Sequence, residues 1–227
     1  MKISILIPTF RRPKLLLRAV HSVFALAAQP DNIEVIVRVS HNDETGLDLI
    51  GQIPQYNTRV ILGPELKGYM DLHTLTTECA NISSGGWLFA MNDDAYFDSH
   101  DWDLTLPNPE GKRLVFPKID WPIARDDKEY LAFAAGPRYD FPIITRDLYE
   151  TIGCFSPTPV YDWFWHGAFH RFPFLGGEVL PGLVIQHEYL RRKCADTILN
   201  FEKEEKVIEY RTPEMQQQIE QAYAKIP

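Results

Sequence analysis

An apolar run that ends in two acids decides the fold, and it reads Trp87-Leu88-Phe89-Ala90-Met91-Asn92-Asp93-Asp94. Residues 87–91 predict a buried strand, because every one of them is apolar. The acids then stand at the carboxyl end of that strand, the edge of an open α/β sheet where ligands bind. Neighbouring carboxylates disfavour each other's ionisation, so a divalent cation would stabilise them. Asn and Asp are also common in turns, and an ordinary solvated turn is the alternative interpretation.

The segments around this strand alternate between apolar runs and helical spacing. Strands are expected at residues 3–7, 33–39 and 59–62, each a short run rich in apolar residues. Helices are expected after Pro13 and from Leu72 to Ile82, where apolar residues recur three or four apart. The first 97 residues therefore read strand-helix-strand-strand-helix-strand, the pattern of a layered α/β domain.

The second half is less regular. Its expected strands are short and lie at residues 114–116, 131–134, 179–180 and 184–186. Its expected helices follow a Thr145 cap and end before Gly153, span 162–169, and follow the Thr212-Pro213 pair. We expect one domain, 1–227, made of a nucleotide-binding half (about 1–100), an acceptor half (about 101–195) and a C-terminal helical tail (about 196–227).

Composition narrows the classes of protein. The chain has 227 residues, a formal net charge of -8 and a pI of about 5.4. Net acidity argues against nucleic-acid binding through a basic surface. Cys79, Cys154 and Cys194 are far apart and odd in number, so we expect buried small hydrophobes and a cytoplasmic location rather than disulfides. No signal peptide or transmembrane span is expected, although peripheral membrane contact would need no span.

Four blocks of sequence, taken together and in this order, resemble the family-two glycosyltransferases. Residues 4–13, which contain Pro8-Thr9-Phe10-Arg11-Arg12-Pro13, are similar to the opening of that family. Residues 86–97 resemble its Asp-x-Asp region. Residues 144–146 with 152–155 look like the segment before its catalytic residue, and residues 180–187 look like its late strand ending in a metal-binding His. The resemblance covers roughly residues 3 to 190.

The resemblance implies a GT-A fold, an α/β three-layer sandwich with a mixed, mainly parallel central sheet. It implies a nucleotide-sugar donor (a UDP- or GDP-sugar), Mn²⁺ or Mg²⁺, and transfer with inversion to a hydroxyl of a glycan or other acceptor. By this match Asp94 ligates the metal, His187 completes the metal site, and Asp93 lies beside the ribose or sugar. Asp43 is the expected contact to the base, although the family's usual Asp pair is absent there. Asn92 replaces a common acidic residue, which leaves the donor open.

Residues Pro8, Thr9, Phe10 and Arg11 follow the first strand and are expected to bind the base and diphosphate of the donor, because Arg matches phosphate geometry. A surface Arg beside a turn is the alternative. Arg38 lies inside the second strand, and either points into the nucleotide cleft or pairs with a nearby acid.

Asp162 is the candidate general base. Aromatic residues surround it in the sequence, and such an environment raises the pKa of a carboxyl. A helix N-cap is the alternative role. Four aromatic residues either stack on sugars or fill a core: Trp121, Tyr161, Trp163 and Trp165. Residues 135–137, Ala-Gly-Pro, either let a sugar approach the backbone or form a plain turn. His166 and His170 have metal-capable spacing without an evident third ligand, and we interpret them as structural.

Two other functions stay open. A sugar-nucleotide pyrophosphorylase is disfavoured, because its Gly-rich basic loop is absent after the first strand. A non-catalytic carbohydrate-binding homologue would keep the fold without turnover.

Overall fold

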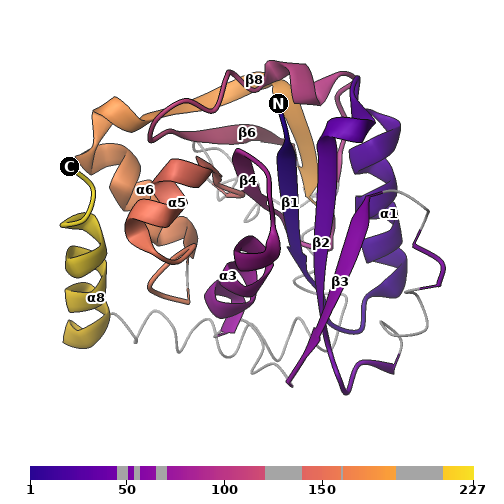
Figure 1. Cartoon of the computed structure of the whole chain (residues 1–227), viewed down its shortest axis with the longest axis horizontal. Helices are drawn as coiled ribbons and strands as arrows, with labels where there is room; N and C mark the ends of the chain where they lie inside the picture. Colours follow the sequence, from indigo (N-terminus) through magenta and orange to yellow (C-terminus); the bar gives the residue numbers. More distant parts are fainter. Residues whose placement is uncertain (45–50, 54–56, 65–70, 121–139, 160, 188–211) are drawn as a thin grey trace, which may run out of the picture.

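A computed structural model describes residues 1–44, 51–53, 57–64, 71–120, 140–159, 161–187 and 212–227, with only the backbone described at 161–163. Its centre is an eight-stranded sheet in the order β3-β2-β1-β4-β7-β6-β8-β5 (Figure 1). The strands are β1 (Ile3–Pro8), β2 (Ile33–Ser40), β3 (Thr58–Gly63), β4 (Trp87–Ala90), β5 (Ala95–Phe97), β6 (Leu114–Asp120), β7 (Ile143–Thr145) and β8 (Gly176–His187).

The sheet is mixed, as predicted. Its parallel pairs are β1 with β2, β1 with β4, β2 with β3, and β6 with β8. Its antiparallel pairs are β4 with β7, β5 with β8, and β6 with β7. The parallel half therefore brings the carboxyl ends of β1, β2 and β4 to one edge.

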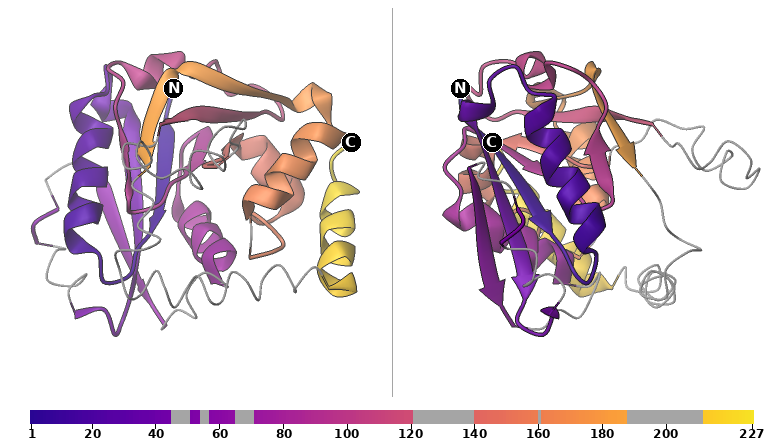
Figure 2. Two further views of the ribbon diagram at one scale, coloured as in Figure 1. Left: turned by 180° about the vertical axis from the view of Figure 1, so that it is seen from behind. Right: turned by 90° about the vertical axis from the view of Figure 1, so that its right-hand side faces the viewer.

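Helices cover both faces of the sheet, which makes three layers (Figures 1 and 2). One face packs against α1 (Pro13–Ala25). The other packs against α3 (Leu72–Ile82), α5 (Arg146–Ile152), α6 (Tyr161–Arg171) and α8 (Pro213–Tyr223). The α8 helix lies at the end of the molecule farthest from α1 (Figure 1). Short 3₁₀ helices lie at Pro30–Asn32, Trp102–Thr105 and Pro173–Leu175.

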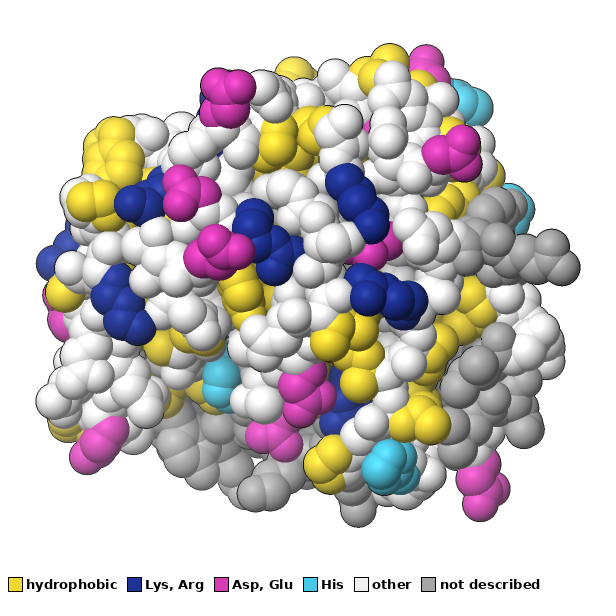
Figure 3. Space-filling model, in the orientation of Figure 1, with side chains coloured by type: hydrophobic (Ala, Val, Ile, Leu, Met, Phe, Trp, Pro, Cys, Tyr) yellow, Lys and Arg dark blue, Asp and Glu magenta, His cyan; other side chains and the backbone are white. Residues whose placement is uncertain are grey.

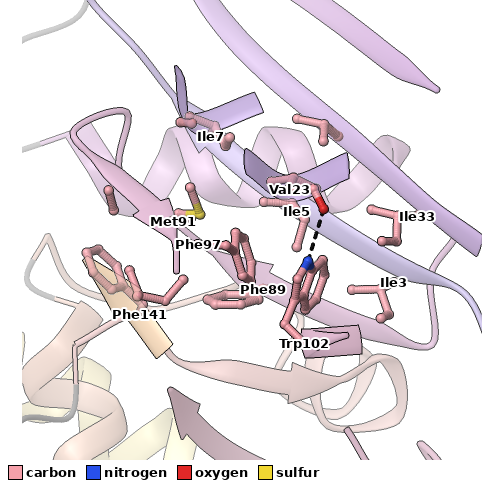
Figure 4. Packing of buried hydrophobic residues seen from close by; sticks show 14 of the residues in the cluster. Ile3, Ile5, Ile7, Val23, Ile33, Phe89, Met91, Phe97, Trp102 and Phe141 are labelled. Atoms are coloured by element: carbon pink, nitrogen blue, oxygen red, sulfur yellow. Dashed lines mark hydrogen bonds between the residues drawn. The ribbon is translucent and has the colours of Figure 1, made fainter. Parts of the chain in front are cut away.

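The alternation of strand residues explains the layers. Ile5 and Ile7 of β1 belong to the cluster that packs on α1, whereas Leu6 belongs to the cluster on the opposite face. The α1-side cluster is shown in Figure 4, where the indole of Trp102 donates a hydrogen bond to the carbonyl of Val23 at 3.0 Å. This bond fixes the chain that follows β5 against α1.

The structure extends or corrects several expected elements. The strands β5 and β7 were not predicted, because three residues are too short to show a period. The two expected pieces near the end form one continuous strand, β8. Thr145 precedes α5 as expected, but its hydroxyl accepts the backbone N–H of Arg113 at 2.9 Å instead of capping the helix. Gly153 ends that helix with a φ of 87°. The expected strand 131–134 lies outside the described residues.

Three features of the described residues bear on the predictions made from composition: the cysteines, the length of the helices and the surface charge. Cys79 is buried and Cys154 is half-buried, both without a disulfide, while Cys194 lies outside the described residues. In the part of the chain that the structure describes, no helix is both long and apolar enough to cross a membrane. On the face in Figure 3, basic side chains are interspersed with acidic ones.

A buried carboxylate ties together the first strands of the sheet. Glu34 in β2 accepts hydrogen bonds from the hydroxyl of Ser4 in β1 at 2.6 Å and from the hydroxyl of Ser84 at 3.0 Å. It also pairs with Arg59 of β3 at 2.7 Å. Burial acts to raise the pKa of Glu34, but the bonds from Ser4 and Ser84 and the charge of Lys2 outweigh it and lower the pKa to about 2.

The lowered pKa of Glu34 predicts a stability that depends on pH. A depressed pKa contributes stability that is fully present above the unfolded value and is lost as pH falls through the folded value. We expect Glu34→Gln to lower the free energy of unfolding at pH 7 by about 2 kcal/mol, and the deficit to shrink between roughly pH 5 and pH 2. Urea unfolding at several pH values measures it, with the exposed Glu178→Gln as control. A deficit that stays constant from pH 7 to pH 3 would contradict this role.

Candidate metal and nucleotide site

The acidic turn lies at the carboxyl end of β4, on the edge defined above. A hydrogen bond of 3.2 Å from the N–H of Ala95 to the carbonyl of Asn92 closes the turn and leads into β5. As whole residues, Asp93 and Asp94 are 5% and 7% exposed, so the acids are buried and the solvated-turn interpretation is wrong. Because β1 lies parallel beside β4, the residues that follow β1 reach the same place.

One oxygen of each carboxylate contacts either a hydroxyl or an imidazole. The hydroxyl of Thr9 donates to Asp93 Oδ2 at 2.7 Å, and Nε2 of His187 lies 3.2 Å from Asp94 Oδ1. The two remaining oxygens contact the same atom, Nη1 of Arg12, at 3.2 Å from Asp93 Oδ1 and 3.5 Å from Asp94 Oδ2. One guanidinium nitrogen therefore lies between the two acids.

The two acids differ in their electrostatics. Burial raises the pKa of Asp93 to about 6, with the charge of Asp94 adding to the rise and Arg12 and Thr9 opposing it. Burial also acts to raise the pKa of Asp94, but the charge and hydrogen bond of His187 and the charge of Arg12 outweigh it and hold that pKa below its usual value. Asp94 is thus the carboxyl whose environment favours the charged form.

Asp94 and His187 fit a divalent cation. Carboxylate oxygen and imidazole nitrogen are both ligands that Mn²⁺ accepts. A six-coordinate ion with bonds of about 2.1 Å holds adjacent ligand atoms about 3 Å apart. The 3.2 Å between Asp94 Oδ1 and His187 Nε2 is near that spacing. Among the described residues, no three His, Cys, Asp or Glu side chains form a metal-holding group, so these two would need ligands from phosphate or water.

The loop after β1 is fixed by Asp43. The backbone N–H of Arg11 donates to Asp43 Oδ2 at 2.7 Å, and Asp43 is fully buried. Arg11 has a φ of 55°, a region that costs energy for a residue with a side chain and is held only by its surroundings. Its exposed guanidinium lies 4.8 Å from the centre of the Phe10 ring. Pro8 ends β1, and in the loop that follows it Thr9 and Arg12 contact the acids.

Arg38 pairs with an acid, the second of its two predicted roles. Its side chain is 1% exposed, faces α3, and forms an ion pair with Glu78 at 2.5 Å. Its guanidinium also donates to the carbonyls of Val39 at 2.6 Å and Pro64 at 3.2 Å. The expectation that Arg38 binds the donor is therefore corrected: these contacts occupy the side chain in the wall between the sheet and α3.

Four of the second-half candidates belong to α6. Asp162 stands in the first turn of this helix, and its side chain, like those of Tyr161 and Trp163, lies outside the described part of the structure. Trp165 is fully buried and donates to the carbonyl of Phe155 at 3.0 Å, so of its two alternative roles it fills the core. Trp121 and residues 135–137 lie outside the described residues.

His166 and His170 form an exposed pair on α6. Their Nε2 atoms lie 2.9 Å apart. The metal-capable spacing noted in the sequence thus becomes a direct contact.

Sequence reasoning missed the role of Arg12. The resemblance indicates roles for the acids and for Arg11, and it contains Arg12 only as one residue of the opening block. A signal was present: residues 9–12 follow one predicted strand, the acids follow another, and parallel neighbouring strands end at one edge. What could not be read was which of the two adjacent arginines turns inward.

The chain matches no protein-family model and no curated protein sequence. Solved structures do match it. Residues 1–349 of TarS from S. aureus align with a TM-score of 0.62 and 12% identity, over 84% of this chain and 61% of that one. A mannosyltransferase from Pyrobaculum calidifontis, in complex with GDP-Man and Mn²⁺, aligns with a TM-score of 0.61 and 15% identity, over 85% and 58%.

Glucosyl-3-phosphoglycerate synthase from Mycobacterium tuberculosis, in complex with Mn²⁺, UDP and glucosyl-3-phosphoglycerate, aligns with a TM-score of 0.57 and 19% identity, over 89% and 76%. The chain thus spans about three fifths of TarS residues 1–349 and of the mannosyltransferase, and 37% of the longer TarS chain. These likenesses confirm the expected GT-A fold.

Proposed function

We propose that this protein is a metal-dependent glycosyltransferase that moves a sugar from a UDP- or GDP-sugar to an acceptor hydroxyl. The observation that carries the proposal is the buried pair Asp93 and Asp94 at the carboxyl end of β4, with His187 at 3.2 Å from Asp94. Support also comes from the neighbours of this fold, whose complexes contain GDP-Man or UDP together with Mn²⁺.

The donor would lie across the edge formed by β1, β2 and β4. Asp94 and His187 would hold Mn²⁺ or Mg²⁺, which when bound would stabilise the charge of the departing diphosphate. Asp93, fixed by the hydroxyl of Thr9 at 2.7 Å, would accept a hydrogen bond from the ribose or sugar. The exposed guanidinium of Arg11 would bind the diphosphate, and Asp43 would orient the loop that carries Arg11.

Asp162 would act as general base on α6. Its carboxylate would take the proton of the acceptor hydroxyl as that oxygen attacks the anomeric carbon. Attack from the side opposite the diphosphate inverts the anomeric configuration, through a transition state that resembles an oxocarbenium ion. The bond to the diphosphate breaks as the new glycosidic bond forms.

The metal site predicts a nucleotide affinity that depends on metal. We expect Mn²⁺ to tighten UDP or GDP binding to the wild type at least about 10-fold, because a cation held by Asp94 and His187 would offset the charge of the carboxylates and attract the phosphates. Asp94→Ala should lose this dependence, measured by calorimetry with and without Mn²⁺. Asp31→Ala, which removes an exposed acid just before β2 at the opposite edge, should behave as wild type. If the wild type binds neither nucleotide under any metal condition, the donor site is wrong.

The role of Asp162 as general base predicts that its replacement slows turnover without weakening nucleotide binding. Asp162→Asn should reduce release of nucleoside diphosphate from UDP-GlcNAc or GDP-mannose by about 10²- to 10⁴-fold, the usual contribution of a general base. Its affinity for UDP or GDP with Mn²⁺ should stay within about twofold, because binding and proton transfer use different groups. Asp147→Asn, an acid in the first turn of α5, is the matched control. Equal turnover in both variants would remove Asp162 from the mechanism.

A further inference from the structure

Arg12 occupies the position that a shared cation would take. Its Nη1 contacts Asp93 Oδ1 at 3.2 Å and Asp94 Oδ2 at 3.5 Å, the two carboxylate oxygens not held by Thr9 or His187. The guanidinium is thus the positive charge that the structure places between the two buried acids. It offsets part of the charge of the acids beside the proposed metal site at Asp94 Oδ1 and His187 Nε2, with one charge where a divalent cation would bring two.

The backbone of Arg12 is anchored while its head lies near the surface. Arg12 is the residue before Pro13 at the start of α1, and its carbonyl accepts the N–H of Leu16 at 3.0 Å. The side chain is 16% exposed, compared with 7% and 9% for those of Asp93 and Asp94. Rotation of the side chain alone can therefore move the guanidinium outward without disturbing the helix.

A metal on Asp94 and the guanidinium in its present place would repel each other. Two cations within a few ångströms of each other repel strongly in a site with little water. Entry of a divalent cation would therefore require the guanidinium of Arg12 to leave Asp94. Once displaced, it would stand at the mouth of the site as a planar donor fork, the group that best matches phosphate oxygens.

We propose that Arg12 is a built-in substitute for the divalent cation, which leaves the carboxylates when the metal binds and then binds the diphosphate of the donor. The inference rests on the proposed function, because it assumes the metal and nucleotide site described there. It assigns to Arg12 the coupling between metal binding and nucleotide binding, a role distinct from that of Arg11.

The charges require metal and nucleotide to bind cooperatively. With His187 neutral, the form in which an imidazole binds a metal, the two carboxylates and the guanidinium together carry one net negative charge, which attracts a cation and repels a diphosphate. Addition of a divalent cation reverses this to one net positive charge, which attracts a diphosphate. By linkage, whatever the metal adds to nucleotide affinity the nucleotide adds to metal affinity.

Removal of the Arg12 guanidinium should strengthen the binding of the metal alone and weaken the coupling between metal and nucleotide. Without nucleotide, we expect Arg12→Ala to bind Mn²⁺ about 10-fold more tightly than the wild type, because the metal no longer competes with a cation. UDP or GDP should raise the Mn²⁺ affinity of the wild type at least about 10-fold, but that of Arg12→Ala only about threefold or less. Electron paramagnetic resonance of free Mn²⁺ measures each affinity, and thermal unfolding followed by circular dichroism checks that each variant is folded.

Two further variants control the test. Arg11→Ala removes the same charge from the neighbouring residue and should bind Mn²⁺ alone as the wild type does. Arg12→Gln, which keeps a hydrogen-bond donor but no charge, should reproduce the Arg12→Ala result and replaces it if that variant does not fold.

The outcomes distinguish this inference from the proposed function. If the wild type shows metal–nucleotide coupling but folded Arg12 variants bind Mn²⁺ alone no more tightly, the substitution role is wrong while the metal site stands. Weaker Mn²⁺ binding in these variants would also overturn it, because a purely structural Arg12 predicts that loss. If no variant binds Mn²⁺ with or without nucleotide, both the inference and the metal site fail.

Discussion

Two neighbouring carboxylates buried at the end of β4 are the constraint around which this edge of the molecule is arranged. Asp93 and Asp94 are almost fully removed from water, where like charges at short range are costly. Three described side chains compensate: Thr9 donates a hydrogen bond to Asp93, His187 faces Asp94, and the guanidinium of Arg12 lies between the two acids. Such a cluster is expensive for stability alone, and it lies at the carboxyl ends of the strands, where ligands bind in open α/β sheets, which is the pattern expected of a functional site.

The sheet explains how residues distant in sequence meet there. Parallel pairing of β1 with β4 brings Thr9 and Arg12 to the acids, and pairing of β5 with β8 aligns Ala95 with His187. The amino-terminal strands are held in turn by Glu34, whose carboxylate joins β1, β2 and β3. The geometry of the site therefore depends on strand register, since a shift of one residue would turn each side chain to the opposite face.

Sequence reasoning reached the fold and four residues of the acidic site, Thr9, Asp93, Asp94 and His187, but not Arg12 or the contacts among these residues. The apolar run at residues 33–39 and the helical spacing in α3 can be recognised in the sequence. The strands β5 and β7 have three residues each, which is too few to show a periodic pattern. The resemblance brought Asp94 and His187 together, which spacing alone could not do. The partner of Arg38 depends on which face of β2 meets Glu78, and the position of Arg12 depends on a side-chain rotamer at the start of α1, so neither follows from composition or periodicity.

The most direct test of the acidic site is a crystal structure of this chain with Mn²⁺ and UDP or GDP, with anomalous data collected for manganese. We expect one anomalous peak within about 2.5 Å of both a carboxylate oxygen of Asp94 and Nε2 of His187. Diphosphate oxygens should complete its coordination, and the guanidinium of Arg12 should point to the phosphate. A nucleotide bound elsewhere, or a peak away from these residues with Arg12 still between Asp93 and Asp94, would contradict the assignment.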